Sequence, residues 1–149
     1  MLKPEKNPGG LPLSVFDDLP SALAANRPQF HQDITLPFYG YNRPGAQNSE
    51  SIREHWWLQG TMGGMKAHYD CIETFSETDF TDDLKKIEIP ALVMHGDDGQ
   101  IVPIGAAGLM SANILKHAML KVYPGFPRRM PTANTKQINA DLLAFSKSW

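Results

Sequence analysis

Apolar residues recur at helical spacing over residues 13–26, which predicts an amphipathic helix in the first part of the chain. Pro20 interrupts this pattern, so the helix should start late or kink there. Residues 1–12 and 36–48 are rich in proline and glycine and therefore predict loops.

Two further helical registers follow between residues 49 and 75, and Gly63 and Gly64 lie where one register gives way to the other. The two glycines therefore predict a break between two helices. Residues 81–86 come next, with acids first and lysines last. The helix dipole favours that order, so this segment predicts one short capped turn rather than a calcium site.

The pattern changes to alternating strands and helices after residue 88. Residues 89–94 form a near-continuous apolar run, typical of a strand that is buried on both faces of a parallel sheet. A helix is predicted over residues 104–115, a second strand over 119–123 and a last helix over 134–149. This order is typical of an α/β fold with parallel crossovers. Two strands make a small sheet, so the sequence implies more sheet than it contains.

Composition excludes several classes of protein. The 149 residues are 42% hydrophobic and 20% charged, as in an ordinary globular domain. The net charge of −2 argues against nucleic acid or an anionic membrane surface as a partner. The apolar runs are far shorter than the roughly 20 residues of a membrane span. The single cysteine, Cys71, is predicted to be a small core residue and suits a reducing, cytoplasmic location.

The residues around the first predicted strand resemble a known family. Two segments, residues 76–87 and residues 90–103, resemble the cofactor-free haloperoxidases, which are also described as perhydrolases or aryl esterases. The second segment contains the string His-Gly-Asp-Asp-Gly-Gln-Ile-Val-Pro. Shorter matches to the same family occur over residues 8–12, 57–60, 69–72 and 139–145. The resemblance therefore covers essentially the whole chain.

This resemblance implies the C-terminal half of an α/β-hydrolase fold. Residues 1–88 would be an N-terminal loop and helical cap region, and residues 89–149 the last two parallel strands with their helices. Members of the family are expected to hydrolyse esters through an acyl-serine and to pass the acyl group to hydrogen peroxide, without a metal or other cofactor. The five histidines do not fall at metal-ligand spacing either.

The three residues that the family uses for catalysis are absent from this sequence. No serine stands in a G-x-S-x-G motif, the position of the acid is Gly99, and the position of the histidine is Arg128. Arginine stays protonated and cannot act as a base. Asp98 precedes the lost acid but would have no histidine to orient. Asp97 is expected to bind the loop backbone, and His95 is interpreted as a loop residue with a hydrogen-bonding role.

Aromatic residues of the helical region have two possible roles. Trp56 and Trp57 with Phe75 either line an aromatic pocket or pack as ordinary core. The resemblance implies a pocket for a small acyl or ester ligand. The residues expected to border it are Trp57, Ile101, Val102 and Phe126.

The sequence alone thus predicts a truncated, degenerate α/β-hydrolase that is catalytically inactive by itself. One alternative is an enzyme half that a partner chain completes, although no partner could restore Gly99 and Arg128. Another alternative is a non-catalytic binding module. The uncovered edge of the first strand also predicts self-association.

Overall fold

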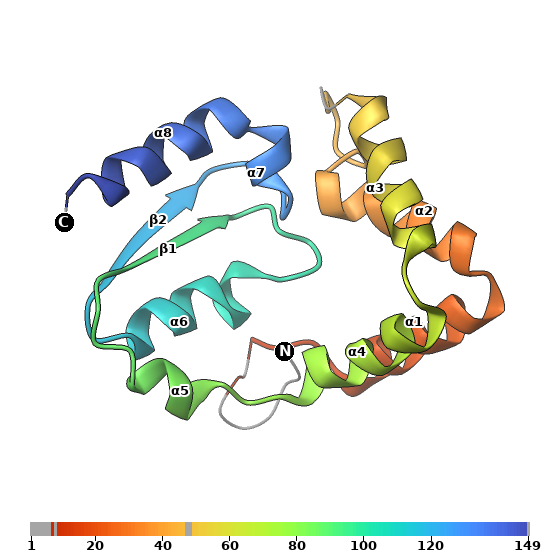
Figure 1. Cartoon of the computed structure of the whole chain (residues 1–149), viewed down its shortest axis with the longest axis horizontal. Helices are drawn as coiled ribbons and strands as arrows, with labels where there is room; N and C mark the ends of the chain where they lie inside the picture. Colours follow the sequence, from red (N-terminus) through yellow and green to blue (C-terminus); the bar gives the residue numbers. More distant parts are fainter. Residues whose placement is uncertain (1–6, 8, 47–48, 149) are drawn as a thin grey trace.

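A two-stranded parallel sheet forms the centre of one part of the molecule (Figure 1). The strands β1 (Ala91–Gly96) and β2 (Ala118–Tyr123) pair from Ala91 opposite Ala118 to Gly96 opposite Tyr123. The computed structural model describes residue 7 and residues 9–46 and 49–148. The predictions for residues 1–6, 8, 47, 48 and 149 lie outside the described residues.

Helices cover both faces of this sheet, as Figure 1 shows. The 3-10 helix η1 (Ile104–Ala106) and α6 (Gly108–Ile114) follow β1, and α7 (Met130–Ala133) and α8 (Thr135–Ser146) follow β2. The order of strands and helices confirms the predicted α/β class. One detail of the prediction was wrong, because the helix expected over residues 104–115 is divided in two.

The core of this β/α part is small. Tyr123, Met130 and Ile138 are buried together, with the half-buried Met94 and Phe126 packed against them. The hydroxyl of Tyr123 donates a hydrogen bond of 2.7 Å to the carboxylate of Asp141 on α8. Burial, together with that hydrogen bond, raises the pKa of Tyr123 above its usual value.

Five helices make up the rest of the molecule. They are α1 (Leu13–Ala25), α2 (Arg27–Tyr39), α3 (Glu50–Met62), α4 (Met65–Glu77) and α5 (Thr81–Lys85). The break at Gly63 and Gly64 and the short turn at residues 81–86 are confirmed. The carboxylate of Asp79 accepts the backbone N–H of Thr81 at 2.9 Å, as expected for the start of a helix.

Proline misled the prediction in two places. The helix α1 starts at Leu13, not late, and continues through Pro20, because the burial of Phe16 and Leu23 outweighs the lost hydrogen bond. The loop expected over residues 36–48 was wrong over its first four residues, because α2 continues past Pro37 to Tyr39. It ends at Gly40, whose positive φ of 72° closes the helix.

The two parts leave much apolar surface uncovered. Within β1 only Gly96 is fully buried, although the sequence predicted a strand buried on both faces. No strand among the described residues pairs with the other edge of β1, and this lack of a neighbour accounts for the difference. Ile89, just before β1, is 71% exposed. Cys71 is also exposed, so its predicted place in the core was wrong.

Candidate functional site

The candidate site lies where the loops after β1 and β2 meet, at the carboxyl ends of the two strands. In α/β sheets this end carries the ligand and the catalytic groups. The carboxylate of Asp97 accepts the backbone N–H of Gly125 at 2.6 Å, which ties the first loop to the second. The predicted backbone-binding role of Asp97 is thereby confirmed.

Gly99, which the sequence resemblance predicts to lie at the position of the family's acid, is buried in a tight turn. Its N–H donates to the carbonyl of Gly96 at 3.3 Å. A Cβ atom at Gly99 would lie 2.9 Å from the carbonyl oxygen of Val102 and 3.3 Å from that of Gly96. The loop has thus closed over this position, and a side chain there would require the backbone to shift.

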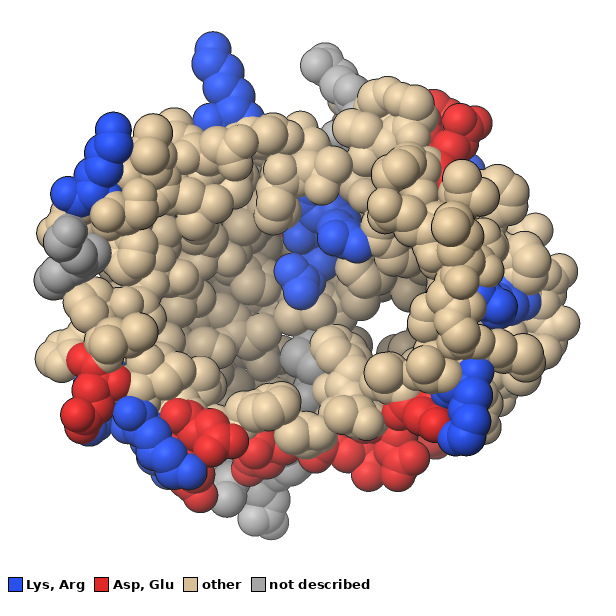
Figure 2. Space-filling model, viewed as in Figure 1, with Lys and Arg blue, Asp and Glu red and all other residues tan. Residues whose placement is uncertain are grey.

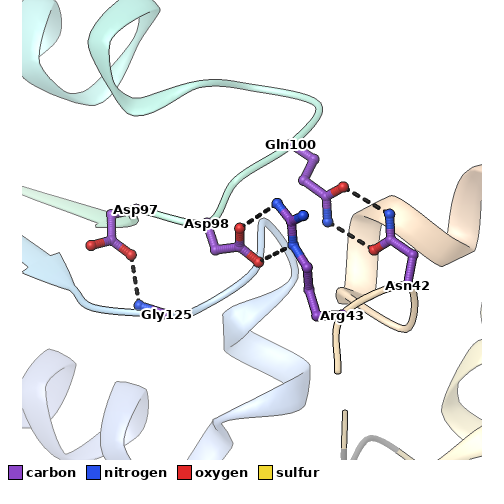
Figure 3. Close-up of polar contacts among 6 residues, drawn as sticks. All are labelled: Asn42, Arg43, Asp97, Asp98, Gln100 and Gly125. Atoms are coloured by element: carbon purple, nitrogen blue, oxygen red, sulfur yellow. Dashed lines mark hydrogen bonds and ion pairs between the residues drawn. The ribbon is translucent and has the colours of Figure 1, made fainter. Parts of the chain in front are cut away.

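Asp98, the carboxylate nearest to the lost acid, is bound by an arginine of the helical part. Figure 3 shows the guanidinium of Arg43 facing both carboxylate oxygens, with Nε at 2.9 Å and Nη2 at 2.6 Å. The hydrogen bond to Asp98 raises the pKa of Arg43 above its usual value. Asp98 therefore pairs with Arg43, which leaves it poorly placed to orient a base.

A second pair of side chains joins the same two loops. Asn42 and Gln100 exchange two amide hydrogen bonds, of 2.8 Å and 2.9 Å (Figure 3). Asn42 and Arg43 lie in the loop between α2 and α3, so this loop is fastened to the loop after β1 at two adjacent residues. The four side chains are called the clasp below. Sequence reasoning missed Asn42 and Arg43, because no motif marks them and their partners lie more than fifty residues away.

Two arginines occupy the loop after β2, which carries the histidine in the family. Arg128 is exposed and forms no ion pair within the described part of the chain. Partial desolvation and the charge of Arg129 lower the pKa of Arg128, but a guanidinium has no lone pair to accept a proton. Arg129 lies over Trp56 at 5.4 Å and over Phe38 at 5.7 Å, which fixes this loop to α2 and α3. Basic side chains gather at the centre of the face drawn in Figure 2.

His95 lies within β1 itself, one residue before the strand ends, and not in the loop. Its Nδ1 lies 2.8 Å from the carbonyl oxygen of Gly96, which confirms the predicted hydrogen-bonding role. The imidazole also packs on Gly108, where an added Cβ would come within 2.9 Å of the ring. His95 is therefore held in place by structure and is not directed at a substrate.

The structure does not bring the four predicted binding residues together. Ile101 lines an apolar pocket of about 510 Å³ between α1, α2, α4 and the loop after β1. Trp57 lies elsewhere, on a separate pocket of α3, and its indole N–H donates to the carbonyl of Pro28 at 2.9 Å. Val102 is buried, and Phe126 stacks on Tyr123 beside the small core.

The aromatic pocket shared by Trp56, Trp57 and Phe75 does not exist in the structure. Phe75 lines the 510 Å³ pocket, Trp57 borders the pocket on α3, and Trp56 borders a third pocket beside Arg129. Helical spacing could not reveal this separation, because α3 and α4 turn the three rings toward different neighbours.

Comparison with known proteins shows which proteins the chain is similar to. No family model matches it. It is 56% identical over 149 residues to a bifunctional esterase/perhydrolase of Acinetobacter calcoaceticus and 55% identical over 149 residues to a non-heme chloroperoxidase of Streptomyces lividans. The chain is similar to the C-terminal half of non-heme haloperoxidases with the α/β-hydrolase fold. The matches cover 99% of this chain and 54% of each relative.

Solved structures show the same similarity. The bromoperoxidase of Bacillus anthracis superposes with a TM-score of 0.91 at 30% identity, over 97% of this chain and 53% of the bromoperoxidase. An esterase of Exiguobacterium antarcticum, at 18% identity and a TM-score of 0.82, supports the fold alone. The chain thus spans about half the length of the curated relatives it matches. Among the described helices, none is long and apolar enough to cross a membrane.

Proposed function

We propose that the 149-residue chain is a non-catalytic half of a haloperoxidase-type α/β-hydrolase. The observation that carries this proposal is that both triad positions within the chain have lost their chemistry, one to Gly99 and the other to Arg128. These two losses stay with the chain whatever other polypeptide accompanies it.

The chemistry of acyl transfer explains why these changes matter. A serine nucleophile needs a base that accepts a proton near neutral pH, and imidazole meets this requirement while guanidinium does not. The acid orients that base, yet the turn at Gly99 has no space for a side chain. The nearest substitute, Asp98, is held by Arg43 at 2.6 Å. Asp98 therefore already has another partner, and Arg128 lacks the nitrogen lone pair that would accept a proton.

The test is p-nitrophenyl acetate hydrolysis by the purified chain, with the Acinetobacter esterase/perhydrolase as positive control. We expect no turnover above buffer, and Arg128→His alone should not create any. Saturable hydrolysis that co-purifies with the chain through repeated purification would contradict the proposal.

A second candidate function rests on the apolar pocket of about 510 Å³. Its walls are mainly hydrophobic and aromatic, and a few polar groups stand at the rim, as in sites for small organic molecules. Among its lining residues are Phe16, Phe30, Ile34, Phe75 and Ile101. These features support the proposal that the chain binds a small acyl or ester compound without turnover.

Calorimetric titration with ethyl hexanoate tests this second proposal. Phe75→Asp should abolish binding, because a carboxylate would enter the apolar wall. Trp57→Ala is the matched control, since Trp57 borders a different pocket and its loss should leave binding unchanged. Equal effects of both variants, or no heat from the unmodified chain, would overturn it.

A partner chain that carries the serine stays a further proposal. Such a partner would cover the open edge of β1 and the apolar surface beside it. It would still meet Gly99 and Arg128 at the triad positions, so we expect an assembled but inactive hydrolase. The predicted cytoplasmic location stays a prediction.

A further inference from the structure

Three basic side chains meet where the helices α2, α3 and α4 come together. Arg27 begins α2, His31 follows one turn later, and His68 lies in the first turn of α4. The guanidinium of Arg27 donates to the carbonyl oxygens of Gly60 at 3.2 Å and Thr61 at 2.5 Å, and also to that of Gly63. It therefore occupies the carboxyl end of α3, where cations are favoured. This junction is called the basic joint below.

Three ring nitrogens of the two histidines are buried without hydrogen-bond partners among the described residues. His31 is 7% exposed, and neither of its ring nitrogens has a partner among the described residues. The ring centroid of His68 lies 5.1 Å away, and its Nδ1 is buried and equally unpartnered. The edges of Phe30 at 5.5 Å and Trp56 at 6.1 Å close the remaining sides of His31.

Both rings lie close to glycines at the end of α3 and in the turn that follows it. A Cβ atom at Gly60 would lie 2.9 Å from Nδ1 of His31, and one at Gly63 would lie 2.3 Å from Nε2 of His68. The close packing of the His31 ring therefore depends on the position of the end of α3 and of the turn between α3 and α4.

Every charge that acts strongly on His31 is positive. Burial lowers the pKa of His31 below its usual 6.5, and the charges of His68 and Arg27 lower it further. Three acids on the same helices pair with other residues: Asp33 with Gln29, Glu50 with Arg53 and Asp70 with Lys66. The remaining acids of α3 and α4 are exposed, namely Glu54, Glu73 and Glu77. The helix α1, which packs on α2 and α4, adds only the exposed Asp17 and Asp18.

We propose that the basic joint is an acid-triggered release for the turn between α3 and α4. Protonation of His31 would place its positive charge beside Arg27 and against aromatic rings, and the turn would move away from α2. Phe75 on α4 lines the apolar pocket, so a shift of α4 would move the wall of that pocket.

The direction of the pH dependence follows from the lowered pKa of the buried His31 ring. The closed joint binds fewer protons than the open one, so its stability is complete above the usual histidine pKa of 6.5 and is lost as the pH falls below that value. Each unit by which the closed joint lowers a histidine pKa corresponds to about a tenfold change in the open fraction.

Amide exchange of the whole chain, corrected for intrinsic rates, tests the proposal. Between about pH 7.5 and about pH 5, protection over residues 58–70 should fall by about tenfold or more, while protection of β1 stays unchanged. The double variant His31→Phe with His68→Phe should lose this pH dependence. His117→Gln, which removes an exposed histidine outside the joint, should keep it.

A second measurement covers the case in which the double variant does not fold. Proton NMR of the unmodified chain should show His31 titrating below 6.5, with the indole signals of Trp56 changing over the same pH range. Protection that is independent of pH, a pH dependence that survives in the double variant, or titration of His31 at or above 6.5 would each overturn the proposal.

Discussion

Substitution of Gly99 tests whether the loop after β1 has closed over the place of the lost acid. The nearest atoms to an added Cβ are the carbonyl oxygens of Val102, at 2.9 Å, and Gly96, at 3.3 Å. Both belong to the backbone and cannot rotate aside as the end of a side chain can. Overpacking of this kind costs about 1–3 kcal/mol, which is a large share of a typical stability of about 5–15 kcal/mol.

We therefore expect Gly99→Ala and Gly99→Asp to lower the free energy of unfolding by similar amounts, about 1–3 kcal/mol, because the clash begins at the Cβ that both share. Gly105→Ala is the matched control. A Cβ at Gly105 meets nothing within 4 Å, so its effect should stay within about 0.5 kcal/mol.

Urea unfolding followed by circular dichroism measures all three variants. Wild-type stability of both Gly99 variants would refute the steric reasoning, because the loop would then still accommodate an acid. A loss in Gly99→Asp without a loss in Gly99→Ala would assign the effect to charge repulsion from Asp98.

Three further predictions concern stability and association. Ile138→Ala, at a side chain only 2% exposed, should cost about 2–5 kcal/mol in urea unfolding, while Leu143→Ala on the exposed face of the same helix should cost less than about 0.5 kcal/mol. Hydrogen bonds from Lys121 and Tyr123 lower the pKa of Asp141, so the contribution of Asp141 to stability is present at neutral pH and is lost as the pH falls below 3.8. The free energies of unfolding of Asp141→Asn and of the unmodified chain should therefore converge at such low pH. A difference that stays constant with pH would contradict this prediction. Ile89→Lys, beside the open edge of β1, should weaken self-association in sedimentation velocity, whereas Leu58→Lys should not; equal effects would place the contact elsewhere.

The sequence sufficed to predict those elements whose apolar pattern is strong. The run at residues 89–94 lies within two residues of β1, because a continuous β-branched and aliphatic stretch has few other stable arrangements. The sequence pattern did not predict the helix α2, because two prolines interrupt it and its apolar residues are only weakly segregated to one face. It forms nonetheless, since Asn26 caps its first turn and Thr35 and Tyr39 are buried against neighbouring helices.

The geometry of the candidate site was not predictable from the sequence. The assignment of Gly99 and Arg128 to the triad positions rests on motif resemblance and stays a prediction. The tight turn at Gly99 and the ion pair of Arg43 with Asp98 depend on contacts between residues that are distant in the sequence. Local spacing carries no information on such contacts. The separation of Trp56, Trp57 and Phe75 onto different pockets could not be predicted for the same reason.

The most direct test of the proposed inactivity mixes the purified chain with the first half of the Acinetobacter relative and follows p-nitrophenyl acetate hydrolysis. If Gly99 and Arg128 occupy the triad positions as we propose, no turnover beyond that of the first half alone is expected, even where light scattering shows that the two halves associate. Saturable turnover that requires both polypeptides would contradict the account.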